Sequence, residues 1–152
     1  MPCNFMSTNY QCTVHDKNLC LEDRLEELIS RVKTGTEKGL FDTRYSRYLQ
    51  TDIAGYSVDA LDLRVYARYT YGTDKISFNY DGCDVLDDNH LLNIVLHENA
   101  HRILFKLANK KGHRFSWYKI YKSLRNSAKP LYSTDGKCPS VKDYLMSKIG
   151  LM

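Results

Sequence analysis

The segment His97-Glu98-Asn99-Ala100-His101 has the residue types and the spacing for metal-dependent hydrolysis. Residues four apart lie on one face of an α-helix, so both imidazoles can bind one Zn²⁺ while the glutamate reaches a zinc-bound water. The alternative is two core histidines bonded to the backbone beside a paired glutamate. Burying these groups on an apolar helix without partners costs several kcal/mol, which favours the metal site.

A catalytic zinc needs a third protein ligand and an open fourth position. No glutamate follows Glu98, which excludes a downstream glutamate as the third ligand. The residue six positions after His101 is a leucine, which excludes a third ligand at that spacing. His113 is favoured because it follows a glycine-containing loop, 109–112, that lets the chain double back, and because a predicted helix after it would fix its ring. The remaining alternatives are Asp135 and Asp143.

Glu98 is the predicted catalytic base, which takes a proton from the attacking water and passes it to the leaving amine. Any of four residues could stabilise the oxyanion, and we assign none of them: Arg114, Tyr118, Tyr121 and Tyr132. His90 lies seven residues before His97 and could orient a ligand, although an exposed position in the first helical turn is favoured.

The motif lies within a strongly apolar helical pattern at 88–109, which predicts a central buried helix. Asp87-Asp88-Asn89 supplies its N-cap and favourable charges in the first turn. Alternation of β-branched and aromatic residues over 63–79, interrupted by a Gly72-Thr73-Asp74 turn, predicts a β-hairpin. Further helices are predicted at 20–34, 114–127 and 141–149, while 36–61 shows no clear pattern. The fold class is therefore α+β.

The chain has 152 residues, 43% apolar and 26% charged, which fits a single domain over 1–152 and excludes a disordered or fibrous protein. We find neither a membrane-spanning run nor a signal peptide, so we expect no membrane partner and a cytoplasmic location, the host cytoplasm if the protein comes from a phage. Five cysteines without a C-x-x-C pair favour reduced thiols; a second metal site at Cys3, Cys12, His15 and Cys20 is the weaker alternative.

His97-Glu98-x-x-His101, followed after eleven residues by His113 and then by Phe115 and Trp117, resembles the SprT-like zinc metalloprotease domain. The predicted helix and hairpin before the motif extend the resemblance to roughly residues 20–127. It implies a zincin-like fold, a small antiparallel sheet, one Zn²⁺ per chain and proteolysis, in some members of proteins crosslinked to DNA. Arg114 stands where the family usually has glycine, and we find no zinc ribbon after the domain.

Charge is divided unevenly: residues 1–101 hold 10 basic and 16 acidic residues, whereas 102–152 hold 12 basic and 2 acidic ones. Basic and aromatic residues alternate in the second part, as on single-stranded nucleic-acid surfaces, so DNA is a candidate partner beside a protein or peptide substrate. Alternatively, the aromatics are core and the lysines solvated. The predicted contacts are Lys110, Lys111, Arg114, Lys119, Lys122 and Arg125.

Three functions therefore remain open: a zinc-dependent protease, a zinc hydrolase of other amides such as peptidoglycan cross-peptides, and a non-catalytic basic nucleic-acid-binding module. The absence of a signal peptide and the basic segment weigh against the second. Replacing Glu98 with Gln separates the third from the other two, because a binding module would keep its function.

Overall fold

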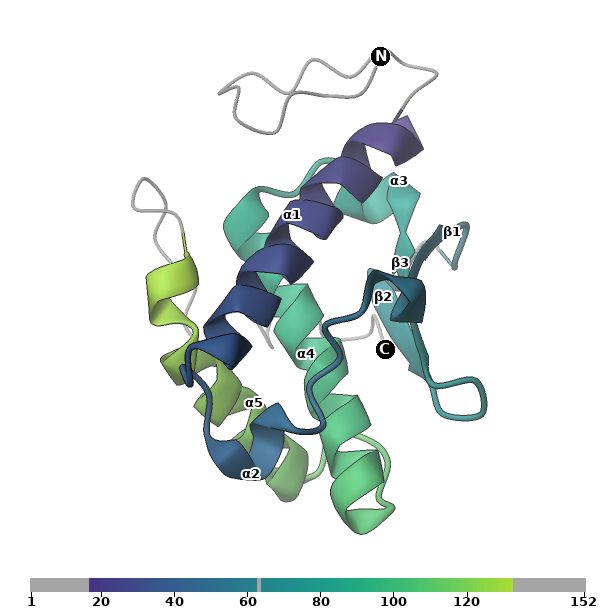
Figure 1. Cartoon of the computed structure of the whole chain (residues 1–152). Helices are drawn as coiled ribbons and strands as arrows, with labels where there is room; N and C mark the ends of the chain where they lie inside the picture. Colours follow the sequence, from purple (N-terminus) through teal and green to yellow (C-terminus); the bar gives the residue numbers. More distant parts are fainter. Residues whose placement is uncertain (1–16, 63, 133–152) are drawn as a thin grey trace.

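The computed structural model describes residues 17–62 and 64–132, and these form an α+β fold built around one long buried helix (Figure 1). The five helices of this part are α1 (Lys17–Glu37), α2 (Thr43–Ser46), α3 (Tyr80–Cys83), α4 (Asp88–Ala108) and α5 (Phe115–Ser127). The strands are β1 (Tyr56–Asp59), β2 (Ala67–Thr70) and β3 (Lys75–Asn79). Two short 3₁₀ turns span Ile53–Gly55 and Lys129–Leu131.

The predicted helices at 20–34, 88–109 and 114–127 are confirmed as α1, α4 and α5. The predicted helix at 141–149, together with Asp135 and Asp143, lies outside the described residues. Within the described part of the chain, no helix is long and apolar enough to cross a membrane.

The predicted hairpin is confirmed, but the sheet is mixed rather than purely antiparallel. β2 and β3 pair antiparallel, and β1, from the stretch without a clear pattern, pairs parallel to β3 in the order β1-β3-β2. β1 is four residues long and only partly buried, so it shows no alternation that marks a strand. Its partner lies about 20 residues away in the sequence, which local pattern cannot reveal.

α4 is the centre of the fold and packs against α1, α5 and β2 (Figure 1). Its N-terminus is capped as predicted, because the Asp87 carboxylate accepts a hydrogen bond of 2.8 Å from the His90 amide. It ends at Asn109 in the left-handed conformation, with φ of 54°. α4 also buries six polar side chains among its apolar ones, and each of them requires a partner: Asn89, Asn93, His97, Glu98, Asn99 and His101.

Candidate metal centre

Three imidazoles converge at one point between the middle of α4 and the loop before α5. His113 Nε2 lies 3.1 Å from His101 Nε2 and 3.2 Å from His97 Nε2, and the three nitrogens lie within 4.8 Å of one another. His97 and His101 are buried in α4, whereas His113 is exposed. The structure therefore brings together the two histidines of the motif and the favoured third ligand.

The donor set fits a metal ion. In a tetrahedral zinc site with Zn–N bonds of 2.0–2.1 Å, two ligand nitrogens lie about 3.3 Å apart. The separations from His113 to the other two histidines are close to this value. Three neutral imidazoles that leave a fourth position open suit zinc and its first-row neighbours.

The Trp117 side chain packs against all three histidine rings and is only 1% exposed. It stacks on the His101 ring with 5.2 Å between the ring centres. It meets the His97 and His113 rings edge-on, with 4.7 and 4.6 Å between the ring centres. One indole thus contacts all three histidines, so their orientation depends on the first turn of α5. Phe115, two residues earlier, instead lies 76% exposed.

The loop reaches back to α4 through a backbone conformation that favours glycine. Gly112 has φ of +87°, and His113 follows it directly. The sequence-based expectation that a glycine-containing loop lets the chain double back is therefore confirmed by the loop geometry.

Glu98 lies next to the three histidines at the floor of an open cleft. Its Oε2 is 3.5 Å from His97 Nε2, and its side chain has no exposed surface. The cleft has a volume of about 550 Å³ and is lined by Arg68, Tyr69, Thr70, Tyr71, Glu98, His101, Lys111, Gly112 and His113. The lining thus comes from β2 with the residue after it, from α4, and from the loop that carries the third histidine.

A model of the SprT-like family matches residues 21–140. The chain belongs to the SprT-like family. No characterised protein and no solved structure matches it at a significant level. The family match covers α1 through α5, and with it the three histidines and Glu98.

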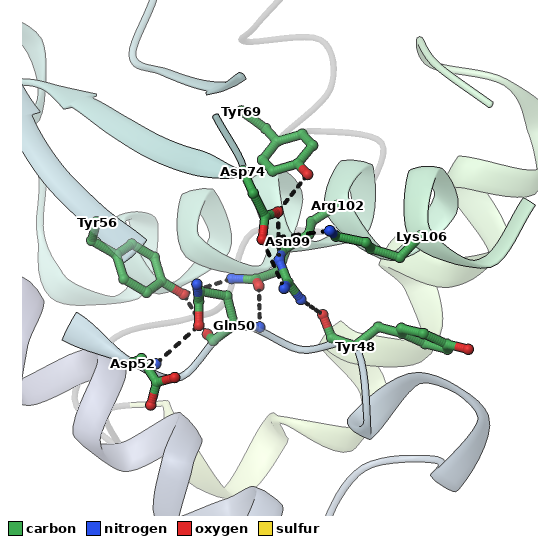
Figure 2. Close-up of polar contacts among 9 residues, drawn as sticks. All are labelled: Tyr48, Gln50, Asp52, Tyr56, Tyr69, Asp74, Asn99, Arg102 and Lys106. Atoms are coloured by element: carbon green, nitrogen blue, oxygen red, sulfur yellow. Dashed lines mark hydrogen bonds and ion pairs between the residues drawn. The ribbon is translucent and has the colours of Figure 1, made fainter. Parts of the chain in front are cut away.

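The opposite face of α4 in this SprT-like domain anchors the rest of the fold, and Asn99 is its centre (Figure 2). The Asn99 side chain accepts a hydrogen bond of 2.8 Å from the Gln50 amide, and donates to the Tyr56 hydroxyl at 2.8 Å and to the Val95 carbonyl at 2.9 Å. Tyr56 in turn donates to the Gln50 carbonyl at 2.6 Å. A polar residue inside the metal-binding motif therefore ties the chain before β1 to α4.

Arg102, one turn after Asn99, ties the β2–β3 turn to the same helix (Figure 2). Its guanidinium makes two parallel hydrogen bonds to Asp74, of 2.9 and 3.0 Å, and also donates to the Tyr48 carbonyl. The Tyr69 hydroxyl donates to Asp74 at 2.6 Å, and the Lys106 ammonium lies 3.6 Å from it. These contacts fix the end of β2 beside the metal centre.

The contacts of Asp74 favour its ionised form. Partial burial raises its pKa, but hydrogen bonds from Arg102 and Tyr69 and the charges of Arg102 and Lys106 outweigh it, and the pKa lies below its usual value. Asp74 has φ of 53°, a conformation that Asp tolerates better than most residues.

None of the four residues considered for oxyanion stabilisation lines the cleft. Tyr121 has no exposed surface and stacks under Trp117, while Tyr132 is buried and donates to Asn93. Tyr118 and Arg114 are not among the residues that line the cleft, and the Arg114 guanidinium donates to the Lys111 carbonyl at 3.0 Å. Tyr71, which sequence reasoning missed, does line the cleft.

His90 lies at the start of α4. Its ring is 3.1 Å from the Asp87 carboxylate, and its side chain is 41% exposed. The favoured expectation of a partly exposed first-turn residue matches this position. The ring contributes to the start of the helix rather than to the orientation of a ligand.

Five of the six predicted nucleic-acid contacts are exposed on the loop before α5 and on α5 itself: Lys110, Lys111, Arg114, Lys119 and Lys122. Arg125 is buried, 9% exposed on the inner side of α5, so its place among the surface contacts is corrected. Arg125 comes one residue after the buried Leu124 and four after the buried Tyr121, so the helical period places it closer than Lys122 to the side of α5 that faces the core.

Proposed function

We propose that this domain is a zinc-dependent endopeptidase that holds one Zn²⁺ per chain through His97, His101 and His113. The observation that carries the proposal is the convergence of three imidazole nitrogens with a buried glutamate beside them, at the floor of an open cleft. SprT-like family membership supports the same chemistry. A purely structural zinc site would instead be closed by a fourth protein ligand.

Glu98 performs the proton transfers in this proposal. A zinc ion held by the three imidazoles would lower the pKa of its bound water and would polarise a carbonyl group. The Glu98 carboxylate, 3.5 Å from one ligand nitrogen, is placed to accept the proton of the attacking water. The same carboxyl group then donates that proton to the nitrogen that leaves as the peptide bond breaks.

The cleft wall favours an extended peptide over a compact amide. β2 is an outer strand of the sheet and pairs, among the described strands, with β3 alone. Its other edge lies along the cleft, where Arg68 to Tyr71 form the wall. Backbone groups at a strand edge pair with an extended chain, which would place a scissile bond above the metal. This arrangement favours protein substrates over peptidoglycan cross-peptides.

Replacing Glu98 with Gln tests the proposal directly. The variant keeps the shape of the side chain but lacks the base, so we expect zinc content to stay near one per chain and cleavage of an unfolded protein such as casein to fall about 100-fold or more. Glu26→Gln, on the exposed face of α1, is the matched control and should retain full activity. Equal cleavage by the wild type and Glu98→Gln, or none by either, would reject an endopeptidase that works through Glu98.

A second candidate property is binding of single-stranded DNA beside the cleft. Phe115 lies 76% exposed with the Lys119 ammonium 5.7 Å from its ring centre, and Lys122 follows on the same face of α5. Residues 102–132 contain no acidic side chain. An exposed aromatic ring among cations is the combination that stacks bases and contacts phosphates.

Fluorescence anisotropy with a labelled single strand tests this surface. Phe115→Ala should weaken binding about tenfold through lost stacking, and Lys119→Ala should reduce the slope of affinity against salt concentration. Lys33→Ala on α1 provides an exposed lysine far from α5 in sequence, and should bind like the wild type. Unchanged binding in all three variants would remove this surface from the proposal.

A further inference from the structure

Tyr71 follows directly after β2 and contributes to the cleft wall together with Glu98, His101 and His113. Its ring is held on three sides. The Tyr69 and Phe105 rings meet it edge-on, each at 4.9 Å, and the Lys111 ammonium lies 4.8 Å above its centre. These contacts come from β2, α4 and the loop before α5, so the ring position is determined by all three elements around the cleft.

The hydroxyl of Tyr71 is influenced by the residue that precedes the third histidine. The backbone amide of Gly112, which is joined to His113, acts on the Tyr71 hydroxyl as a donor and lowers its pKa. A phenol has one donor hydrogen and two acceptor positions, so an amide donor near the oxygen leaves the O–H to donate elsewhere. Burial raises the pKa of Tyr71, and the hydroxyl keeps its proton at neutral pH.

Attack on a peptide carbonyl places negative charge on its oxygen, and a donor held rigidly in the cleft stabilises that charge. The neighbouring hydroxyl of Tyr69 already donates to Asp74 at 2.6 Å. Thr70 also lines the cleft, but it is the exposed last residue of β2, whereas the Tyr71 ring is held by three neighbours. The hydroxyl that is best held beside the metal centre is therefore that of Tyr71.

We infer that Tyr71 is a catalytic residue that donates a hydrogen bond to the oxyanion formed on the scissile carbonyl. The inference rests on the proposed endopeptidase function and adds the stabilising group that the metal-binding motif does not contain. The bond is made in the transition state rather than in the substrate complex, so its loss should lower kcat and leave KM almost unchanged.

Tyr71→Phe tests the inference because it removes the hydroxyl and keeps the ring. We expect kcat to fall about 100-fold, with zinc content and melting temperature unchanged. The affinity for a phosphinic peptide, whose tetrahedral oxygens imitate the transition state, should fall by the same factor in calorimetry, and the affinity for the parent peptide on a Glu98→Gln background should not. Tyr45→Phe, half-buried in α2 and outside the cleft lining, is the matched control.

The outcomes separate the two proposals. Cleavage that depends on Glu98 but is retained in full by Tyr71→Phe would overturn the role of Tyr71 alone, as would unchanged phosphinic peptide affinity. Wild-type protein without any Glu98-dependent cleavage would overturn the endopeptidase function itself. If Tyr71→Phe lowers both kcat and the affinity for the phosphinic peptide while its zinc content stays normal, both proposals are supported.

Discussion

Replacing Asn99 with Ala should destabilise the domain without disturbing the metal centre. Asn99 has no exposed surface, and its side chain makes three hydrogen bonds on the face of α4 opposite to His97 and His101. Figure 2 shows the two of them that join Asn99 to Gln50 and Tyr56. The substitution leaves the Gln50 amide without its acceptor and removes a donor from the Tyr56 hydroxyl. Gln50 lies on the segment that leads into β1, and Tyr56 is the first residue of that strand.

The magnitude follows from these contacts. An orphaned amide costs about 1–3 kcal/mol, and the bond to Tyr56 adds about 1 kcal/mol. Alanine regains roughly 0.5 kcal/mol through its higher helix propensity. The expected loss in the free energy of unfolding is therefore about 1.5–3.5 kcal/mol, which lowers the melting temperature by roughly 3–14 °C in a domain of this size.

Urea unfolding at one fixed zinc concentration measures this loss, because bound metal stabilises the folded state by mass action. Asn126→Ala, at an exposed position of α5, is the matched control and carries the same gain in helix propensity. In a double-mutant cycle, Asn99→Ala and Tyr56→Phe should couple by about 1 kcal/mol. If Asn99→Ala is as stable as Asn126→Ala, Asn99 does not anchor the fold. If Asn99→Ala has lost its zinc, the anchoring face of α4 is not independent of the face that carries His97 and His101.

Two further predictions concern the third ligand and the β2–β3 turn. His113→Ala should abolish stoichiometric zinc binding in elemental analysis, whereas Asp135→Ala should retain about one zinc per chain, since three histidines complete the protein ligand set; the reverse result would reassign the third ligand. Asp74→Asn should destabilise the domain in a pH-dependent way. The pKa of Asp74 is lowered in the folded state, so the stabilisation from its ion pair is fully present above the unfolded value of about 3.9 and is lost as pH falls through the folded pKa. Unfolding series should show a constant difference between wild type and variant from about pH 6 to 8 that closes below about pH 4; a difference that persists unchanged in acid would show that the carboxylate charge is not responsible.

The residues of the candidate metal centre were predictable from sequence because most of their arrangement is local. His97 and His101 share a face of α4 through the helical period, and Glu98 lies between them in the chain. His113 was favoured by its place after a glycine-containing loop, and the structure brings its ring to the other two. The hairpin and the N-cap of α4 also depend on neighbouring residues alone.

Other features depend on segments far apart in the chain, so no local pattern could indicate them. β1 is a strand because β3 offers it a partner about 20 residues later, and its own four residues carry little signal. Arg125 looked like the other cations of its segment, yet the orientation of α5 on the core buries it. Trp117 supports all three histidine rings only because α5 packs on α4.

The sequence by itself determined which atoms can bind a metal and which carboxylate can move a proton, since helical spacing and side-chain chemistry are properties of neighbouring residues. The tertiary structure alone decided how a substrate can reach them. It lines the cleft with the residues of β2, fixes that strand through Arg102 and Asp74, and brings the Tyr71 ring to Lys111 in the loop that carries His113. These contacts join residues about 30 to 40 positions apart, and only the packed core sets their distance.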